Sequence, residues 1–324
     1  MVTIHSSPLQ GFTDFRFRNA FKRFFGGIDQ YIAPYIRVNG KLEIKPGNRD
    51  ILPANNGSLS LIPQIITKDA DEFLFVAKYV QKLGYTELNW NLGCPYPMIA
   101  KRGMGSGLLS MPDKINEILT KVFAETDIHV SVKMRLGYES SREIFHVLPV
   151  LERYRLANIT IHPRIGKQLY RGEVDLNTFE ECIGLSSHKI FYNGDITSVQ
   201  RFREMKERFP TINHWMIGRG LIADPFLPAM IKADVTVYPE NRYEVFNSFH
   251  DALLSSYEEA LSGRKHLLMK MYSLWEFFIQ AFPQAQKCLK KIKKARSLSV
   301  YKEVVKQIIY DETFNVAQGF PSGK

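Results

Sequence analysis

The sequence predicts an α/β protein in two parts, a (β/α)8 TIM barrel over residues 1–238 and a smaller all-helical domain over residues 239–324. Two observations predict this architecture. Up to about residue 230, short runs of β-branched and apolar residues alternate with amphipathic segments, as in a barrel. Beyond Pro239, long helical patterns follow without a strand candidate. A doubly wound sheet is the alternative, but no GxGxxG motif follows an early strand.

Eight runs are the expected barrel strands. In chain order they are Val2–Ser6, Ile28–Pro34, Ser60–Ile66, Thr86–Asn91, Ile128–Met134, Asn158–His162, Lys189–Asn193 and His214–Ile217. The helices expected between them include Ala70–Leu83, Asp113–Glu125, Arg142–Tyr154 and Ser198–Phe209. In the helical domain we expect helices at Tyr243–Leu261, Lys265–Phe282 and Gln284–Ile309, with their aromatic residues in a core. The last dozen residues are polar, and we expect them to be frayed.

The composition favours a globular protein with no membrane anchor. Hydrophobic residues make up 45% of the chain, enough for a large core. No run of about 18 apolar residues is present, so we expect neither a membrane span nor a signal peptide, and a cytoplasmic location. Cys94, Cys182 and Cys288 are far apart and odd in number, which argues against a disulfide framework. No CxxC or HExxH spacing occurs, so we expect no metal site, and we expect a monomer.

The positive charge is unevenly distributed along the chain. The net charge is +10, and the segment from Asn241 onward has 13 basic against 8 acidic residues, an excess of five. Eight basic residues there face one acid, Glu303, and they are Lys287, Lys290, Lys291, Lys293, Lys294, Arg296, Lys302 and Lys306. Such a run is either a solvated helix face or a nucleic-acid-binding surface. The sequence by itself favours neither.

Polar residues follow seven of the eight predicted strands. In a barrel, the carboxyl ends of the strands form the active-site face. The residues at these ends are Ser7, Pro8, Leu9, Gln10 and Gly11; Gln64; Asn91 and Cys94; Lys133 and Arg135; His162 and Arg164; Asn193, Gly194 and Asp195; and Gly218, Arg219 and Gly220. We therefore expect one ring of functional side chains.

Cys94 is the candidate reactive group of this ring. It ends an apolar run between Gly93, which tolerates unusual backbone angles, and Pro95, which favours an extended Cys94. An isolated cysteine is most often a buried structural residue. Its place in the ring favours a thiol that acts as an acid across a substrate pocket.

The loops after the last two strands indicate a phosphorylated cofactor. Such loops commonly bind phosphate through backbone N–H groups, and here they contain glycines and Arg219. Lys133 and His162 would then contact the other end of the cofactor. An ammonium beside the pyrimidine edge of a flavin stabilises the anionic reduced ring.

The sequence resembles the tRNA-dihydrouridine synthases from Pro8 to Arg219. The segments that carry the resemblance are Pro8–Asp14, Asn91–Pro95, Ser131–Gly137, His162–Arg164, Gln168–Gly172, Asn193–Asp195 and Ile217–Gly220. The resemblance implies an FMN-containing barrel and a helical tRNA-binding domain. It further implies reduction of the C5=C6 bond of particular uridines, with NADPH as the electron donor.

The resemblance also implies a role for each matching residue. Cys94 would donate the proton. Residues that would contact FMN are Pro8, Leu9, Gln10, Gln64, Lys133, His162, Asn193, Gly194, Asp195, Gly218 and Arg219. Residues that would line the substrate path are Asn91, Arg135, Arg164, Gln168 and Tyr170. The chain departs from the family at Gln10 and Asn89, where acidic residues are common, and at Tyr96-Pro97-Met98, where a lysine is common.

Two rival functions remain open at the level of sequence. An FMN-dependent barrel oxidoreductase acting on a small pyrimidine would share the phosphate loops, but it would not need a basic helical domain. A catalytically silent RNA-binding protein would not need Cys94, Lys133 and His162 together. Which tRNA uridine is modified, and whether NADPH or NADH serves better, also stay open.

Overall fold

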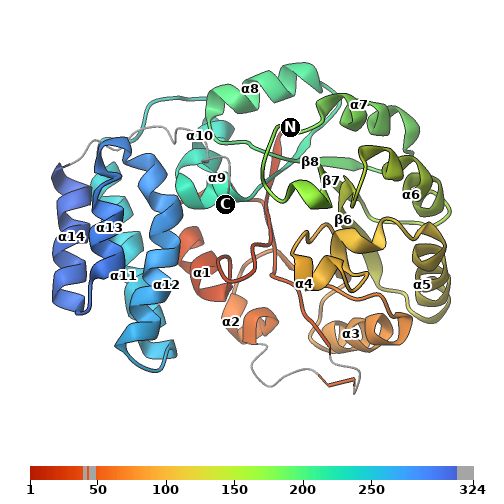
Figure 1. Cartoon of the computed structure of the whole chain (residues 1–324), viewed down its shortest axis with the longest axis horizontal. Coiled ribbons are helices and arrows are strands. Elements are labelled where there is room, and N and C mark those ends of the chain that lie inside the picture. The colour runs from red at the N-terminus through yellow and green to blue at the C-terminus, as the bar shows by residue number, and fades with distance from the viewer. Residues whose placement is uncertain (39–41, 44–48, 312–324) are drawn as a thin grey trace.

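The computed structural model of the chain describes residues 1–38, 42–43 and 49–311 (Figure 1). The strands are β1 (Thr3–Ser6), β2 (Gln30–Ile32), β3 (Leu61–Ile62), β4 (Gln64–Ile65), β5 (Glu87–Leu92), β6 (His129–Gly137), β7 (Ile159–Ile165), β8 (Ile190–Asn193) and β9 (His214–Ile217). They form one sheet in the order β3-β2-β1-β9-β8-β7-β6-β5-β4, and every pairing is parallel.

The two edges of this sheet belong to one predicted strand. β3 and β4 are separated by Pro63, which has no backbone N–H and interrupts the ladder. β3 pairs with β2, and β4 pairs with β5, so the sheet closes into a barrel at this point. The eight predicted strands and the barrel are thereby confirmed.

Helices surround the barrel in the order that the sequence predicts (Figure 1). Those of the barrel are α1 (Phe15–Phe24), α2 (Pro53–Asn56), α3 (Ala70–Lys82), α4 (Pro97–Ala100), α5 (Pro112–Glu125), α6 (Ile144–Leu151), α7 (Leu176–Leu185), α8 (Val199–Arg208), α9 (Arg219–Ala223) and α10 (Leu227–Ala233). Those after Pro239 are α11 (Arg242–Ala260), α12 (Arg264–Phe278), α13 (Cys288–Lys294) and α14 (Leu298–Asp311). Short 3-10 turns lie at Arg49–Ile51, Gly105–Leu108, Ser141–Glu143, Gly166–Gln168, Ile279–Ala281 and Pro283–Ala285.

Several boundaries differ from the predicted ones. β6 and β7 continue past Met134 and His162, because the arginines at their ends still lie in the sheet. The single helix predicted over Gln284–Ile309 is wrong. Ala295 is extended after α13, and the Ser297 hydroxyl accepts a hydrogen bond from the Val300 N–H, which starts α14 as a new helix. The predicted fraying of the last dozen residues concerns residues that lie outside the described part of the chain.

The helices after Pro239 pack on the barrel through aromatic residues. Phe249 of α11 lies with its ring centre 4.9 Å from Phe25, 5.8 Å from Phe17 and 6.5 Å from Phe21. Phe246, Phe249, Trp275 and Phe278 have no exposed surface, as the core interpretation predicted. In Figure 1 these helices stand beside α1 at one side of the barrel. No helix in the described ranges is long and apolar enough to cross a membrane.

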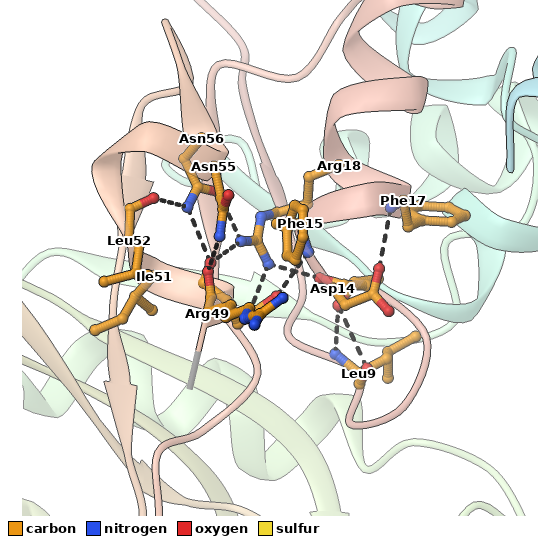
Figure 2. Close-up of polar contacts among 12 residues, drawn as sticks. Leu9, Asp14, Phe15, Phe17, Arg18, Arg49, Ile51, Leu52, Asn55 and Asn56 are labelled. Carbon is orange, nitrogen blue, oxygen red and sulfur yellow. Dashed lines mark hydrogen bonds and ion pairs between the residues drawn. The ribbon is translucent and has the colours of Figure 1, made fainter. Parts of the chain in front are cut away.

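A buried arginine holds the base of the first barrel loop. Arg18 donates to the carbonyl oxygen of Thr13 at 2.8 Å, to the Asp50 carboxylate at 3.0 Å and to Asn56 Oδ1 at 2.8 Å (Figure 2). Asp14 caps α1 by accepting from the Phe17 N–H at 3.1 Å (Figure 2). These contacts fix the end of the segment that contains Pro8, Leu9 and Gln10.

Candidate active site

Most of the predicted site residues meet at the carboxyl ends of the barrel strands. The parallel register pairs Asn91 with Lys133 and, two residues further along β6, Arg135 with His162. Both pairs lie on neighbouring strands near the carboxyl ends. Gly218, after β9, lies against Ser7, after β1: a Cβ added at Gly218 would be 3.3 Å from the Ser7 Cβ. The ring expected from the strand ends therefore forms around the barrel mouth.

The backbone of Cys94 is fixed by the side chain of Asn91. Asn91 Oδ1 accepts hydrogen bonds from the Gly93 N–H at 3.0 Å and from the Cys94 N–H at 2.9 Å. The carbonyl oxygen of Cys94 accepts from both the N–H and the hydroxyl of Ser106, at 3.1 and 3.0 Å. Gly105 is required here, because its φ is +56° and an added Cβ would lie 2.7 Å from that carbonyl oxygen. The thiol is thus held rather than mobile.

The surroundings of Cys94 keep its thiol protonated. Burial raises the pKa of Cys94 above its usual value of about 9, although Tyr35, Arg135 and Lys133 act in the opposite direction. Tyr35 and Cys94 both pack against the buried cluster of Ile66, Ile99 and Met104, and the Tyr35 hydroxyl is one of the groups that lower the pKa of the thiol. Tyr35 follows β2, the strand for which the sequence analysis found no functional residue. Its position one residue after Pro34, at a strand end, was the available signal.

A cluster of cations lies beside the thiol. It contains Lys133, Arg135, Arg164 and Arg219, with Asp195 as the carboxylate that pairs with two of them. Burial lowers the pKa of Lys133 to about 7 and that of Arg135 to about 10, and neighbouring positive charges add to both shifts. Burial also lowers the pKa of His162, which lies beside Arg164, well below its usual range, so this imidazole is neutral.

Arg164 and Arg219 organise the loops after β7 and β8. Arg164 bonds with both oxygens of Asp195, donates to the Gly172 carbonyl oxygen at 2.7 Å and lies 3.1 Å from His162 Nε2. Arg219 donates to Asp195 Oδ1 at 2.8 Å. Arg164 is almost fully buried, so it braces the site from within, whereas the sequence analysis expected it on the substrate path.

Tyr170 lies between two of these guanidinium groups. Its ring centre is 4.6 Å from the Arg219 Cζ and 5.2 Å from the Arg135 Cζ. Gln168 holds the preceding turn, because its Oε1 accepts from the Ile165 N–H at 2.8 Å. Tyr170 is only partly buried and faces the mouth with an aromatic ring, as a substrate-binding residue would.

The structure fits an anionic cofactor with a phosphate end. The three arginines of the cluster exceed its one acid by two charges, and by three when Lys133 is protonated. The Nε atoms of Arg135 and Arg164 are buried without a hydrogen-bond partner in the described chain. Gly220 lets the last two loops touch, because a Cβ there would lie 2.1 Å from the Ile196 carbonyl oxygen. Asn193 Nδ2 donates to the Met216 carbonyl oxygen at 2.8 Å, which ties β8 to β9 beneath these loops.

The other predicted cofactor contacts divide into exposed and buried residues. Pro8 and Leu9 are partly buried and Gln10 is exposed, on the loop that a bound ring would face. Gln64 has no exposed surface, and both ends of its amide are hydrogen-bonded to asparagines. It lies beneath the site. The sequence analysis also missed Ser131, which has no exposed surface and lies below Lys133 on β6.

These features define a parallel (β/α)8 barrel that holds a partly buried thiol beside a cluster of cations at its mouth. The chain belongs to the dihydrouridine synthase (Dus) family, whose family model matches residues 5–316. That family is one of oxidoreductases.

Individual relatives agree with this membership. The chain is 28% identical over 273 residues to a probable tRNA-dihydrouridine synthase of Rhodobacter capsulatus, which covers 81% of this chain and 83% of that protein. It is 26% identical to tRNA-dihydrouridine synthase B of Pasteurella multocida, over 69% of this chain and 67% of the other. It is 25% identical to tRNA-dihydrouridine(16) synthase of Cupriavidus necator, over 72% and 74%.

The fold also matches solved structures of morphinone reductase. One, a mutant in complex with tetrahydroNAD, superimposes with a TM-score of 0.51 at 9% identity, over 76% of this chain and 90% of that one. A second gives a TM-score of 0.52 at 10% identity, over 76% and 88%. At this identity the likeness concerns the barrel fold.

Proposed function

We propose that this protein reduces the C5=C6 bond of particular uridines in tRNA to give 5,6-dihydrouridine, with FMN as its cofactor and NADPH as electron donor. The observation that carries the proposal is the partly buried thiol of Cys94, with its raised pKa, beside the cation cluster at the barrel mouth. The names of the relatives support tRNA as the substrate.

Cys94 provides the acid that this reaction needs. Reduction of uracil requires a hydride at C6 and a proton at C5, and FMN, when bound and reduced, supplies the hydride. The thiol supplies the proton, because a raised pKa keeps it protonated at neutral pH. Asn91 holds the backbone of Cys94, and one N–H of its amide remains available to the base.

The cofactor would lie between the first and the last barrel loops. Arg219, Gly218 and the segment Asn193–Asp195 would hold the phosphate end, and Pro8, Leu9 and Gln10 would lie against the ring. Lys133 and His162 would face the pyrimidine edge, where an ammonium stabilises negative charge. Gln64 would support this edge from below. Tyr170 and Arg135 would line the path of the base, with Arg164 and Gln168 bracing them.

Residues 239–324 would form the tRNA-binding domain, and residues 1–238 the FMN-binding catalytic domain. The eight basic residues between Lys287 and Lys306 are all exposed, as a phosphate-binding surface requires. A uridine inside folded tRNA must be turned out of its stack to reach the barrel mouth, at a cost of a few kcal/mol. Binding of the RNA backbone would offset that cost. We further propose that the protein is a monomer and is located in the cytoplasm.

The test is reconstitution of the reaction. The purified chain, loaded with FMN, is incubated with unmodified tRNA and NADPH, and the nucleosides are analysed by mass spectrometry. We expect a uridine that has gained two hydrogens. A parallel reaction with NADH in place of NADPH tests the preference for the electron donor. A protein that takes up no FMN, or that turns over free pyrimidines but not tRNA, would contradict the proposal in favour of a rival function.

A further inference from the structure

Beneath Cys94, a continuous line of buried polar side chains runs down the inside of the barrel. Asn91 Nδ2 donates to Gln64 Oε1 at 2.8 Å, and Gln64 Nε2 donates to Asn89 Oδ1 at 2.7 Å. Asn89 Nδ2 then donates to Ser131 Oγ at 2.9 Å. Gln64, Asn89 and Ser131 have no exposed surface. The line therefore connects the loop of Cys94 with Ser131 in the interior of the barrel.

The direction of every bond in this line follows from its upper end. The backbone N–H of Cys94 can only donate, so the carbonyl of Asn91 must face it and the amide nitrogen of Asn91 must face Gln64. Gln64 must therefore accept from Asn91 with its Oε1 and donate to Asn89 with its Nε2. Asn89 in turn accepts with its Oδ1 and donates to Ser131 with its Nδ2. Ser131 consequently accepts at its oxygen, and its own hydroxyl proton needs another acceptor.

Glu87 is the acidic residue near this end of the line. It lies two residues before Asn89 on β5, so its side chain points to the same interior face. Burial raises the pKa of Glu87, while Ser131 and Asn158 act in the opposite direction. Its Oε1 is buried without a hydrogen-bond partner in the described ranges, although a buried carboxylate oxygen normally has one.

We propose that Asn89 and Ser131 are positioning residues for Cys94. They keep the amides of Gln64 and Asn91 in one orientation, and Asn91 in turn holds the loop that presents the thiol. The inference rests on the proposed role of Cys94 as proton donor. If the line is broken at its lower end, Gln64 is free to turn its amide, and Asn91 loses its fixed partner.

A matched pair of variants tests the lower end of the line. Ser131→Ala removes the hydroxyl on which the line ends. Thr160→Val removes a hydroxyl that is buried in the barrel but has no hydrogen-bond partner in the described chain, and it serves as the control. With the FMN-loaded protein, we expect Ser131→Ala to change the rate of Cys94 alkylation by iodoacetamide across pH. Its single-turnover rate on tRNA should fall about 10-fold at unchanged tRNA affinity. Thr160→Val should behave like the parent in both.

A second pair tests the direction of the bonds. Asn89→Asp keeps an acceptor for Gln64, and Ser131 can turn its proton toward the new carboxylate, so the upper part of the line survives. Asn89→Leu removes both bonds. We expect Asn89→Asp to retain the alkylation profile of the parent, and Asn89→Leu to lose it as Ser131→Ala does.

The outcomes separate this inference from the proposed function. Identical alkylation profiles for the parent, Ser131→Ala and Thr160→Val would overturn the inference, whether or not Asn89→Leu folds. A parent that makes no dihydrouridine would overturn the proposed function, whereas alkylation requires neither tRNA nor NADPH.

Discussion

Lys270 of α12 donates a hydrogen bond to the carbonyl oxygen of Gly11, 2.6 Å away, and thereby joins the helices after Pro239 to the first loop of the barrel. Its ammonium also lies 4.5 Å from the ring centre of Tyr257 and 3.7 Å from Asp14 Oδ2. Gly11 follows directly on Pro8, Leu9 and Gln10. The segment proposed to lie against the cofactor ring is therefore held partly by the helical region.

This contact predicts that Lys270→Met weakens FMN retention, although Lys270 lies outside the cofactor site. A hydrogen bond from a charged donor contributes about 1.5–3 kcal/mol, and we expect FMN affinity to fall about 10-fold. Flavin titration of the apoprotein, followed by fluorescence, measures the change. Lys265→Met is the control, since Lys265 is exposed on the same helix. Equal affinity in both variants would mean that the loop keeps its position without α12.

Replacement of Cys94 should separate proton donation from flavin chemistry. Cys94→Ala should still bind FMN and accept electrons from NADPH, but it should form dihydrouridine about 10²–10⁴-fold more slowly, as expected for loss of a general acid. Stopped-flow flavin reduction and a single-turnover tRNA assay measure the two steps. A tRNA rate equal to that of the parent would remove Cys94 from its role.

The same thiol predicts a pH profile for the parent. Only the protonated thiol can donate, and burial raises the pKa of Cys94. The single-turnover rate should therefore stay level through neutral pH with respect to this group, and decrease only as the pH rises through the elevated pKa. A decrease between pH 6 and 8 that Cys94→Ala abolishes would show a lowered pKa, opposite to the direction given by the burial of this thiol.

Arg219→Ala should weaken FMN binding through two effects. It removes a cation from the phosphate end, a loss of about 1.5–3 kcal/mol, and it leaves Asp195 with Arg164 as its remaining partner in this cluster. We expect an increase of about 10-fold or more in the dissociation constant of FMN. Arg203→Ala is the control, because Arg203 pairs with Asp234 on the exposed side of α8. Riboflavin, which lacks the phosphate, should bind both variants alike.

The lowered pKa of Lys133 predicts that the affinity of the apoprotein for FMN depends on pH. Burial lowers the pKa of Lys133 to about 7, so the ammonium form predominates below this pH and is lost above it. A cofactor that favours the ammonium form binds with uptake of a proton at higher pH, and its affinity should decrease as the pH rises from 7. Titration calorimetry in two buffers of different ionisation enthalpy measures the proton uptake. Lys133→Met should abolish this dependence.

The basic run after Lys287 predicts a strong salt dependence of tRNA binding. Each phosphate contact releases counterions, so affinity should fall steeply with salt. Replacement of Lys290, Lys291, Lys293 and Lys294 by Gln should flatten this slope and leave flavin reduction by NADPH unchanged. Filter binding at several salt concentrations measures it. An unchanged slope would assign the run to a solvated helix face, and the loops around Arg37, Lys101 and Arg102 would be examined next.

The barrel could be predicted because its strands are short, buried and regularly separated by amphipathic helices. Its helical appendage was predicted in kind, but the break after α13 was not. That break depends on Ser297 capping a new helix, a local choice that hydrophobic periodicity does not reveal.

The sequence predicted which residues gather at the site better than it predicted the contacts between them. Parallel strands place their ends at one face, so Cys94, Lys133 and His162 were expected together from order alone. Tyr35 and Ser131 were missed, because a tyrosine and a serine within or after a strand have no distinctive pattern.

The sequence by itself determined the type of fold, the place of the Cys94 thiol at a strand end and the sign of charge at the barrel mouth, because these depend on residue type and on the order of strands. Only the tertiary structure decided which polar groups are buried and what each one bonds to. Arg164 became an internal brace and Gln64 a link in a buried line, because their partners come from strands far apart in the chain. Burial, not residue type, sets the pKa shifts of Lys133 and Cys94, and it exists only once the barrel is closed.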